Sequence, residues 1–339
     1  MKNNITFDDV AKYTGFSKTT ISRYFNKPET LTDKNRDIIK TALKDLNYQE
    51  NKVAKILARG HTELLGIIVP NFYFQFYSVM INRIINTYQQ YGYKFIVFVS
   101  NDDEKIERKC IRELMAYKIE GLINFSHALS SSELTELRVP VILVERENQH
   151  LSSCCTNNYV GARLATKKLI ADKCDIILHL NDQKSPLSPT YQRITGFEET
   201  CQENNRQYEI IYREFPLVFQ EMMNITSDTL TYVFDKYPDG KKGIFCANDN
   251  IASSLLNSAF RKNISIPDEL EIIGFDNSPL TEEGIITIST VAQDTKALAQ
   301  NIMEMMIRKI ALYNTPNFQS DIIEHIIINP SFIGRQTTL

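Results

Sequence analysis

The sequence predicts a small all-α head followed by an α/β core of two doubly wound lobes. A run of helix caps and turns over residues 6–26, followed by an amphipathic helix after residue 32, predicts the head. From residue 63 onward, short apolar runs alternate with amphipathic helices, as in parallel sheets covered on both faces. The chain has 339 residues, 43% of them hydrophobic, which is enough for more than one domain.

The head begins with two short helices joined by a tight turn. Thr6 suits an N-cap, and Asp9 stands where a capping box needs an acid. Gly15 can adopt the positive φ that ends a helix, and Ser17 can cap a second helix over about 18–25. With apolar side chains inside and polar ones outside, this is a helix-turn-helix, whose second helix is typical of major-groove recognition.

A third helix is expected from Thr32 to about Leu46, and it completes a three-helix core. Its apolar side chains at helical spacing are Ile38, Ile39, Ala42, Leu43 and Leu46. The expected domains are the head at 1–48, a hinge helix and linker at 49–61, and the core at 62–339. Within the core we expect one lobe at about 62–160 and 291–320, and the other at about 161–290 and 321–337.

The elements of the core follow from the alternation of patterns. Strands are expected at 64–70, 93–100, 120–126, 140–145, 175–180, 208–212, 242–246 and 270–275. Helices are expected at 76–91, 104–117, 131–137, 159–172, 191–204, 217–236, 249–262 and 295–313. Ligands of doubly wound sheets bind at the carboxyl ends of the strands, so we expect a binding site there.

Charge is distributed unevenly along the chain. The net charge is −3, but residues 1–60 hold 12 Lys and Arg against 7 Asp and Glu, a net +5 that leaves −8 for the rest. A positive head neutralises phosphates, whereas an acidic core is repelled by a polyanion. The charge distribution therefore supports DNA binding by the head.

Several function classes are disfavoured. The sequence contains no GxGxxG, Walker, GxSxG or HExxH motif, so we expect no enzyme activity and no cofactor. Six cysteines lack metal-ligand spacing, so we expect free buried thiols and no metal site. No apolar run approaches a membrane span of roughly 18 to 20 residues, and the start lacks a signal-peptide core, so we expect a cytoplasmic protein.

The head resembles the DNA-binding head of the lactose-repressor (LacI/GalR) family. The matching residues are Thr6, Asp9, Val10, Ala11, Gly15, Ser17, Thr20, Ser22, Arg23 and Asn26. By matching position, the resemblance implies DNA contacts from Thr6, Ser17, Lys18, Thr19, Thr20, Ser22, Arg23 and Asn26 in the head, and from Asn51, Val53, Ala54 and Leu57 in the hinge. Leu57 would press between base pairs in the minor groove. Glu50 stands where the family usually has proline.

The likeness extends through the core, where ELLGIIVP, RITGF, IFCANDNIA, IIGFDNSPL and STVAQD occur in family order. It implies a core similar to a periplasmic sugar-binding protein, with three crossovers between the lobes. The effector-binding residues implied by position are Phe72, Tyr73, Phe74, Phe76, Asn158, Tyr191, Arg193, Asn248, Asp276 and Gln293. Rings on one lobe would face polar groups on the other, although each ring taken singly is about as readily part of a core or interface.

The resemblance implies a sequence-specific DNA-binding regulator, a repressor of a carbohydrate-utilisation operon switched by a sugar or sugar derivative. Its expected partners are double-stranded operator DNA, the effector and a second copy in a homodimer. The alternatives are a solute-binding component of a sugar transport system and a regulator controlled by a nucleobase or a protein co-repressor. Replacing Arg193 or Asp276 by alanine is expected to abolish the effector response while folding stays nearly intact.

Overall fold

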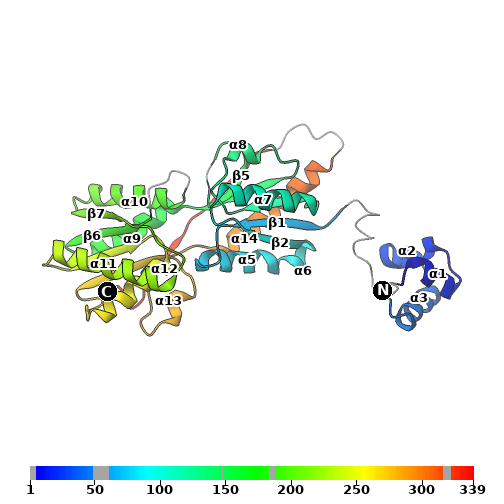
Figure 1. Cartoon of the computed structure of the whole chain (residues 1–339), viewed down its shortest axis with the longest axis horizontal. Coiled ribbons are helices and arrows are strands. Elements are labelled where there is room, and N and C mark those ends of the chain that lie inside the picture. The colour runs from blue at the N-terminus through cyan, green and yellow to red at the C-terminus, as the bar shows by residue number, and fades with distance from the viewer. Residues whose placement is uncertain (1–4, 49–60, 147, 183–187, 316–321) are drawn as a thin grey trace. The chain divides into compact units, whose positions relative to one another are not determined.

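Two units make up the chain in the computed structural model, Met1–His61 and Thr62–Leu339 (Figure 1). The structure describes residues 5–48, 61–146, 148–182, 188–315 and 322–339. In these ranges no helix combines the length and the apolar character needed to cross a membrane.

The first unit contains the expected helix-turn-helix. Its elements are α1 (Phe7–Thr14), α2 (Lys18–Asn26), the 3-10 helix η1 (Pro28–Thr30) and α3 (Asp33–Asp45). The Thr6 backbone N–H donates to the Asp9 carboxylate at 2.9 Å, and Gly15 has a φ of 71° where α1 ends. The Ser17 side chain accepts from the Thr20 backbone N–H at the start of α2. Gly15 and Ser17 therefore fix where α1 ends and where α2 begins, on the two sides of the turn.

A small apolar core joins the three helices. Val10, Ile21 and Ile39 are fully buried, and the rings of Phe7 and Phe25 stack at a centroid distance of 5.3 Å. The expectation that Ile38 belongs to this core is wrong, because its side chain is 39% exposed. Ile38 lies one residue from Ile39, and a rotation of about 100° per residue turns it off the buried face.

The first lobe of the core is a six-stranded parallel sheet. Its order is β11-β5-β4-β3-β1-β2, and all neighbouring strands run parallel. The strands are β1 (Leu64–Val69), β2 (Lys94–Val99), β3 (Gly121–Asn124), β4 (Val141–Val144), β5 (Ser152–Thr156) and β11 (His325–Ile328). Its helices are α5 (Gln75–Asn86), α6 (Tyr88–Tyr91), α7 (Glu104–Ala116), α8 (Ser131–Leu134) and α14 (Thr295–Tyr313).

The second lobe repeats this plan with one antiparallel edge strand. Its order is β12-β10-β9-β8-β6-β7, and β12 runs antiparallel to β10. The strands are β6 (Ile176–Asn181), β7 (Tyr208–Tyr212), β8 (Lys242–Cys246), β9 (Leu270–Asp276), β10 (Ser289–Ala292) and β12 (Ser331–Ile333). Its helices are α9 (Asn158–Ala171), α10 (Thr190–Glu203), α11 (Phe219–Lys236), α12 (Asp249–Arg261) and α13 (Leu280–Glu283).

The chain passes between the lobes three times. It crosses between β5 and α9, between β10 and α14, and between β11 and β12. The boundary expected at 320/321 is therefore wrong, because β11 belongs to the first sheet and the last crossing follows residue 328. Sequence reasoning also missed β5, whose sequence SSCCT has no apolar run although all five residues are buried.

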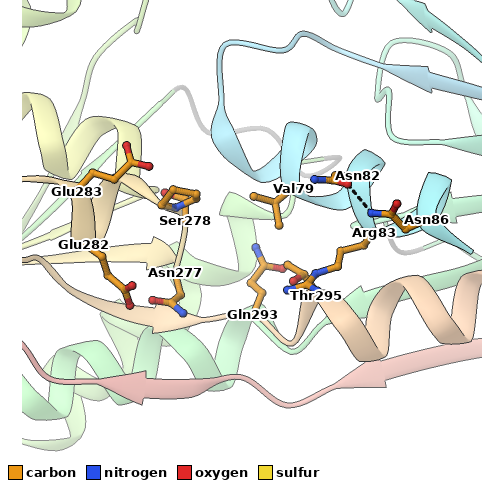
Figure 2. Close-up of a pocket in the computed structure, with 11 residues that line it drawn as sticks. Val79, Asn82, Arg83, Asn86, Asn277, Ser278, Glu282, Glu283, Gln293 and Thr295 are labelled. Atoms are coloured by element: carbon orange, nitrogen blue, oxygen red, sulfur yellow. Dashed lines mark hydrogen bonds between the residues drawn. The ribbon is translucent and has the colours of Figure 1, made fainter.

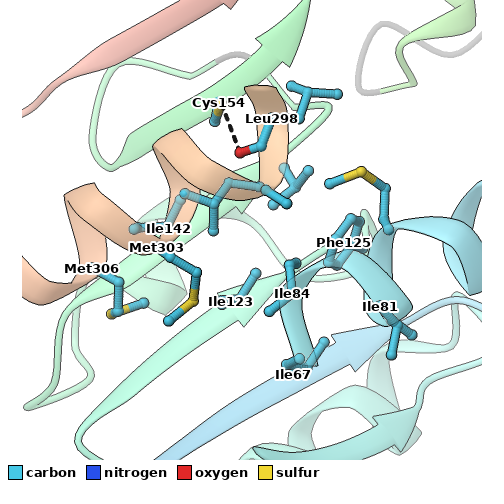
Figure 3. Packing of buried hydrophobic residues seen from close by; sticks show 14 of the residues in the cluster. Ile67, Ile81, Ile84, Ile123, Phe125, Ile142, Cys154, Leu298, Met303 and Met306 are labelled. Carbon is cyan, nitrogen blue, oxygen red and sulfur yellow. Dashed lines mark hydrogen bonds between the residues drawn. The ribbon is translucent and has the colours of Figure 1, made fainter. Parts of the chain in front are cut away.

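The lobe cores are close-packed apolar layers. In the first lobe, Met303 and Met306 of α14 and Ile84 of α5 pack against Ile67 and Ile123 of the sheet (Figure 3). Fully burying one such side chain stabilises the fold by about 1.5–3 kcal/mol. All six cysteines are buried and free, as expected from their spacing.

Candidate DNA-binding surface and interlobe cavity

The second helix of the head presents the expected polar row to solvent. Lys18, Thr19 and Arg23 are exposed, and Ser22 is half-buried. Asn26 donates from Nδ2 to the Ser22 hydroxyl at 3.1 Å, which orders the far end of the row. Amide, hydroxyl and guanidinium groups of this kind can contact base edges and phosphates in a major groove.

Other head residues combine exposure with local hydrogen bonds. The Ser17 and Thr20 hydroxyls lie 2.9 Å apart, and the Thr6 hydroxyl donates to Asp9 at 2.7 Å. Lys18 forms an exposed ion pair with Asp8 of α1 at 2.5 Å. Exposed pairs contribute at most about 1 kcal/mol, so Lys18 can exchange Asp8 for a DNA partner at small cost. The hinge positions Asn51, Val53, Ala54 and Leu57 lie outside the described residues.

A cavity of about 540 Å³ lies between the two lobes of the core. Its described lining consists of Phe74, Phe76, Tyr77, Asp102, His127, Glu145, Asp182, Ser188, Pro189, Thr190, Arg193, Glu214, Phe215, Ala247, Asn248, Ile251 and Asp276. Most of these residues follow the carboxyl ends of β1 to β4 in one lobe and of β6 to β9 in the other. Doubly wound sheets bind their ligands at this edge, and here two such edges face each other.

Three acidic residues of the cavity have unusual backbone conformations. Asp102, Glu145 and Asp276 have φ values of 51°, 54° and 116°. The first two come soon after a strand, and Asp276 is the last residue of β9. Positive φ is unfavourable for residues with a Cβ and persists where surrounding structure enforces it, often at functional sites. The backbone is therefore bent to place these carboxylates at the strand ends.

Arg193 lies at the centre of a buried polar network on the second lobe. Its Nε donates to Asn158 Oδ1 at 2.8 Å, and Nη1 donates to the Ala247 carbonyl. Nη2 lies 4.0 Å from Asp276 Oδ1, and the guanidinium carbon lies 3.6 Å from the centre of the Phe275 ring. Arg193 is only 4% exposed, so its orientation is fixed from several sides.

The network continues into the first lobe. Asn158 donates from Nδ2 to Glu145 Oε2 at 2.9 Å, and the Thr156 backbone N–H donates to Glu145 Oε1 at 2.6 Å. Gln293 donates to Asp276 Oδ1 at 2.6 Å and accepts from the Thr156 hydroxyl at 2.5 Å. Asn158 and Gln293 thus connect the acids of the two lobes from behind the cavity.

Burial controls the protonation of this network. It holds the pKa of Asp276 well above its usual range, against the opposing effect of Arg193, and it raises the pKa of Glu145. Burial also lowers the pKa of His127, which favours a neutral imidazole, and raises the pKa of the Tyr77 phenol. The uncharged forms are favoured because a low-dielectric interior penalises charge.

Aromatic residues line the cavity from both lobes. Phe74, Phe76 and Tyr77 line the cavity from the first lobe, but Phe215 lines it from the second. The expectation of rings on one lobe and polar groups on the other is therefore wrong, because carboxylates also come from both lobes. Phe72 is 47% exposed and is not part of the lining.

Five of the ten expected effector residues do not line the cavity. Phe74, Phe76, Arg193, Asn248 and Asp276 line it, whereas Phe72, Tyr73, Asn158, Tyr191 and Gln293 do not. Tyr73 packs against the apolar core of the second lobe, and Asn158 lies behind Arg193. Gln293 lines a neighbouring pocket of about 560 Å³, among side chains of α5 and the loop after β9 (Figure 2).

Sequence reasoning missed most of the acids. Asp102, Glu145, Asp182 and Glu214 line the cavity, and each lies within three residues of the end of a strand. An acidic residue shortly after an apolar run is visible in the sequence, and the rule that strand ends bind ligands could have identified all four.

Asn250 joins the lobes near the cavity. Its Nδ2 donates to the Tyr73 carbonyl at 3.2 Å, and its Oδ1 accepts from the Gln75 backbone N–H at 3.1 Å. Asn250 belongs to α12 of the second lobe, whereas both partners belong to the first. The side chain therefore stabilises contact between the lobes.

Comparison with known proteins identifies both units. A family model described as bacterial regulatory proteins of the lacI family matches residues 6–51, and one described as a periplasmic binding protein-like domain matches residues 166–338. A helix-turn-helix head joined to such a core is the architecture of a DNA-binding transcriptional regulator. The chain belongs to the lacI family of bacterial regulatory proteins, which confirms the family and fold class expected from the sequence.

Relatives match along nearly the whole chain. The chain is 25% identical over 334 residues to the ribose operon repressor of Halalkalibacterium halodurans, a match that covers 98% of both chains. It is 29% identical to the sucrose operon repressor of Streptococcus mutans, over 91% of this chain and 93% of the relative. A solved periplasmic binding protein/LacI transcriptional regulator from Alkaliphilus metalliredigens, complexed with D-xylulofuranose, has a TM-score of 0.70 at 26% identity over 82% of this chain and 99% of that one.

Proposed function

We propose that the protein represses a carbohydrate-utilisation operon and that a sugar bound in the interlobe cavity changes its affinity for the operator. The observation that carries this proposal is the cavity itself, in which acids and rings from both lobes surround Arg193. Carboxylates and a guanidinium can bind sugar hydroxyls, and aromatic rings can cover the apolar face of a sugar. The names of the ribose and sucrose operon repressors, and the sugar in the related solved structure, support a sugar effector.

The head supplies sequence-specific DNA binding in this proposal. The side chains of Lys18 and Thr19 contact base edges in the major groove, whereas Ser22 and Arg23 hold base and backbone. The hinge residue Leu57 acts as a minor-groove wedge, as matching positions in the family imply. Two heads in a homodimer bind two half-sites, because a two-fold protein matches a near-palindromic operator.

Ligand and DNA are coupled through the arrangement of the lobes. A ligand that contacts both lobes favours the conformation in which they are closest, because its contacts are then most numerous. A change in lobe arrangement alters the operator affinity of the dimer, and DNA changes ligand affinity by the same factor. We infer that the protein acts in the cytoplasm as a regulator without catalytic activity, as its membership of a family of regulatory proteins supports.

The test uses the full-length protein and DNA fragments selected from a random pool by their affinity for it. Fluorescence anisotropy of the selected site, with and without each compound of a panel of sugars and purines, should show one or more sugars changing operator affinity. Phe215→Ala, which removes a ring from the cavity lining, should weaken this response while DNA binding without sugar is retained. Failure to select any preferred DNA would contradict the proposed regulator. A response to purines alone would contradict the sugar effector.

A further inference from the structure

The lining of the interlobe cavity is strongly acidic. Its described residues include five acids, Asp102, Glu145, Asp182, Glu214 and Asp276, but one guanidinium, that of Arg193. Asp102, Asp182 and Glu214 are exposed, whereas Glu145 and Asp276 are buried. Because burial favours the uncharged forms of Glu145 and Asp276, the negative charge of the described lining comes mainly from the exposed carboxylates of Asp102, Asp182 and Glu214. These three charges outnumber the one of Arg193, so the described lining disfavours anions.

The guanidinium of Arg193 is largely occupied by protein groups. Its Nε and Nη1 donate to Asn158 and to the Ala247 carbonyl, and Asp276 lies 4.0 Å from Nη2. A phosphate usually needs several N–H donors or positive charges at once. The exposed acids of the described lining, Asp102, Asp182 and Glu214, accept hydrogen bonds and do not donate them when ionised.

Several first-turn N–H groups of the helices beside the cavity donate to protein groups. At the start of α10, Pro189 has no N–H, and the backbone N–H groups of Thr190 and Tyr191 donate to the side chain and carbonyl of Ser188. At the start of α12, the Asn248 side chain accepts from the Ile251 N–H at 3.0 Å. These first-turn groups are thus already satisfied within the protein.

We propose that the effector is an uncharged, hydroxyl-rich sugar and that the acidic lining excludes phosphorylated and acidic sugars. This inference rests on the proposed function and adds the charge class of the ligand. A neutral sugar can donate hydroxyl protons to the carboxylates, whereas a phosphate group would place about two further negative charges among them.

The test compares matched pairs of compounds on the full-length protein by isothermal titration calorimetry. The pairs are ribose and ribose 5-phosphate, fructose and fructose 6-phosphate, glucose and glucose 6-phosphate, and sucrose and sucrose 6-phosphate. We expect a neutral member to bind and its phosphate to bind at least about tenfold more weakly, a ratio that corresponds to ~1.4 kcal/mol. The ratio should shrink as salt is raised, because exposed charges are screened.

Two variants locate the cause of the discrimination. The double variant Asp182→Asn/Glu214→Gln removes two exposed charges of the lining and should reduce the preference for the neutral member several-fold. The control Glu221→Gln/Asp235→Asn removes the same net charge from exposed positions of α11 in the same lobe, outside the lining. It should leave the preference unchanged.

The outcomes separate this inference from the proposed function. If a phosphate binds as tightly as its neutral partner, or more tightly, the charge assignment is wrong although a sugar effector remains. Equal effects of the two double variants would also overturn it, because net charge and not the lining would then explain the preference. If no compound of either set binds, the sugar-effector function is contradicted together with the inference built on it.

Discussion

Arg193→Ala should destabilise the core, in addition to impairing effector binding. The side chain is 4% exposed, and the substitution removes a buried cation that lies 4.0 Å from Asp276 Oδ1. It also leaves Asn158 Oδ1 and the Ala247 carbonyl without their donor. Leaving a buried acceptor without its hydrogen-bond donor costs about 1–3 kcal/mol, and here two acceptors lose theirs. Burial thus revises the expectation that this substitution leaves folding nearly intact.

The stability lost in Arg193→Ala should be larger at high pH than at low pH. Burial already holds the pKa of Asp276 well above its usual range, and Arg193 opposes this effect. Without the guanidinium the pKa of Asp276 rises further, so the folded variant takes up a proton more readily than the unfolded chain. The stability contributed by that proton is present at low pH and is lost as pH rises. The difference in unfolding free energy between the parent and Arg193→Ala should therefore be larger at pH 8 than at pH 5.

Urea unfolding followed by far-ultraviolet circular dichroism suits this chain, which has no tryptophan. The matched control is Arg163→Ala, which removes a partly exposed guanidinium paired with Glu203 at 2.5 Å and should cost at most about 1 kcal/mol. The reasoning fails if Arg193→Ala costs no more than this control, or if its cost is the same at both pH values.

Three further predictions concern the switch, the pH response and the head. Asn250→Ala removes two hydrogen bonds between the lobes and should weaken effector binding by about 1–2 kcal/mol, measured by calorimetry. Asn257→Ala on the same helix removes only a bond to the Ser253 carbonyl, so an equal effect would contradict a role for contact between the lobes. Burial raises the pKa of Asp249 from 3.8 to about 7, so its contribution to stability is lost as pH rises between these values. Asp249→Asn should therefore change the pH slope of the unfolding free energy by up to about 1.4 kcal/mol per pH unit, and an unaltered slope would exclude this titration. Lys18→Ala and Thr19→Ala should relax base preference, measured as the ratio of affinities for the selected and a scrambled site; an unchanged ratio for both would refute their roles in base contact.

Features encoded by neighbouring residues were predictable from the sequence. The caps at Thr6 and Ser17 and the turn at Gly15 involve partners within a few residues, so composition and spacing identified the helix-turn-helix. The long helices and apolar strands of the core were found for the same reason, because their periodicity is local. Family membership followed from motifs in the same stretches.

The strand β5 shows where local information ends. Its sequence SSCCT resembles a loop, and it is a strand because β4 pairs with it on one side and β11, more than 150 residues away, on the other. The same pairing moved the last crossover beyond residue 328. Burial of a polar strand depends on neighbours that are distant in sequence, so no local pattern indicates it.

Tertiary structure decided more about the cavity than about the fold. The sequence indicated Arg193 and Asp276 through family positions, and the structure brings them together on one wall. Asn158 and Gln293, which occupy equally plausible positions in the sequence, lie behind that wall and orient its acids. Strand order and crossovers decide whether a side chain faces a cavity or only supports another residue that faces it. These features are contacts between distant segments, which motif position alone does not specify.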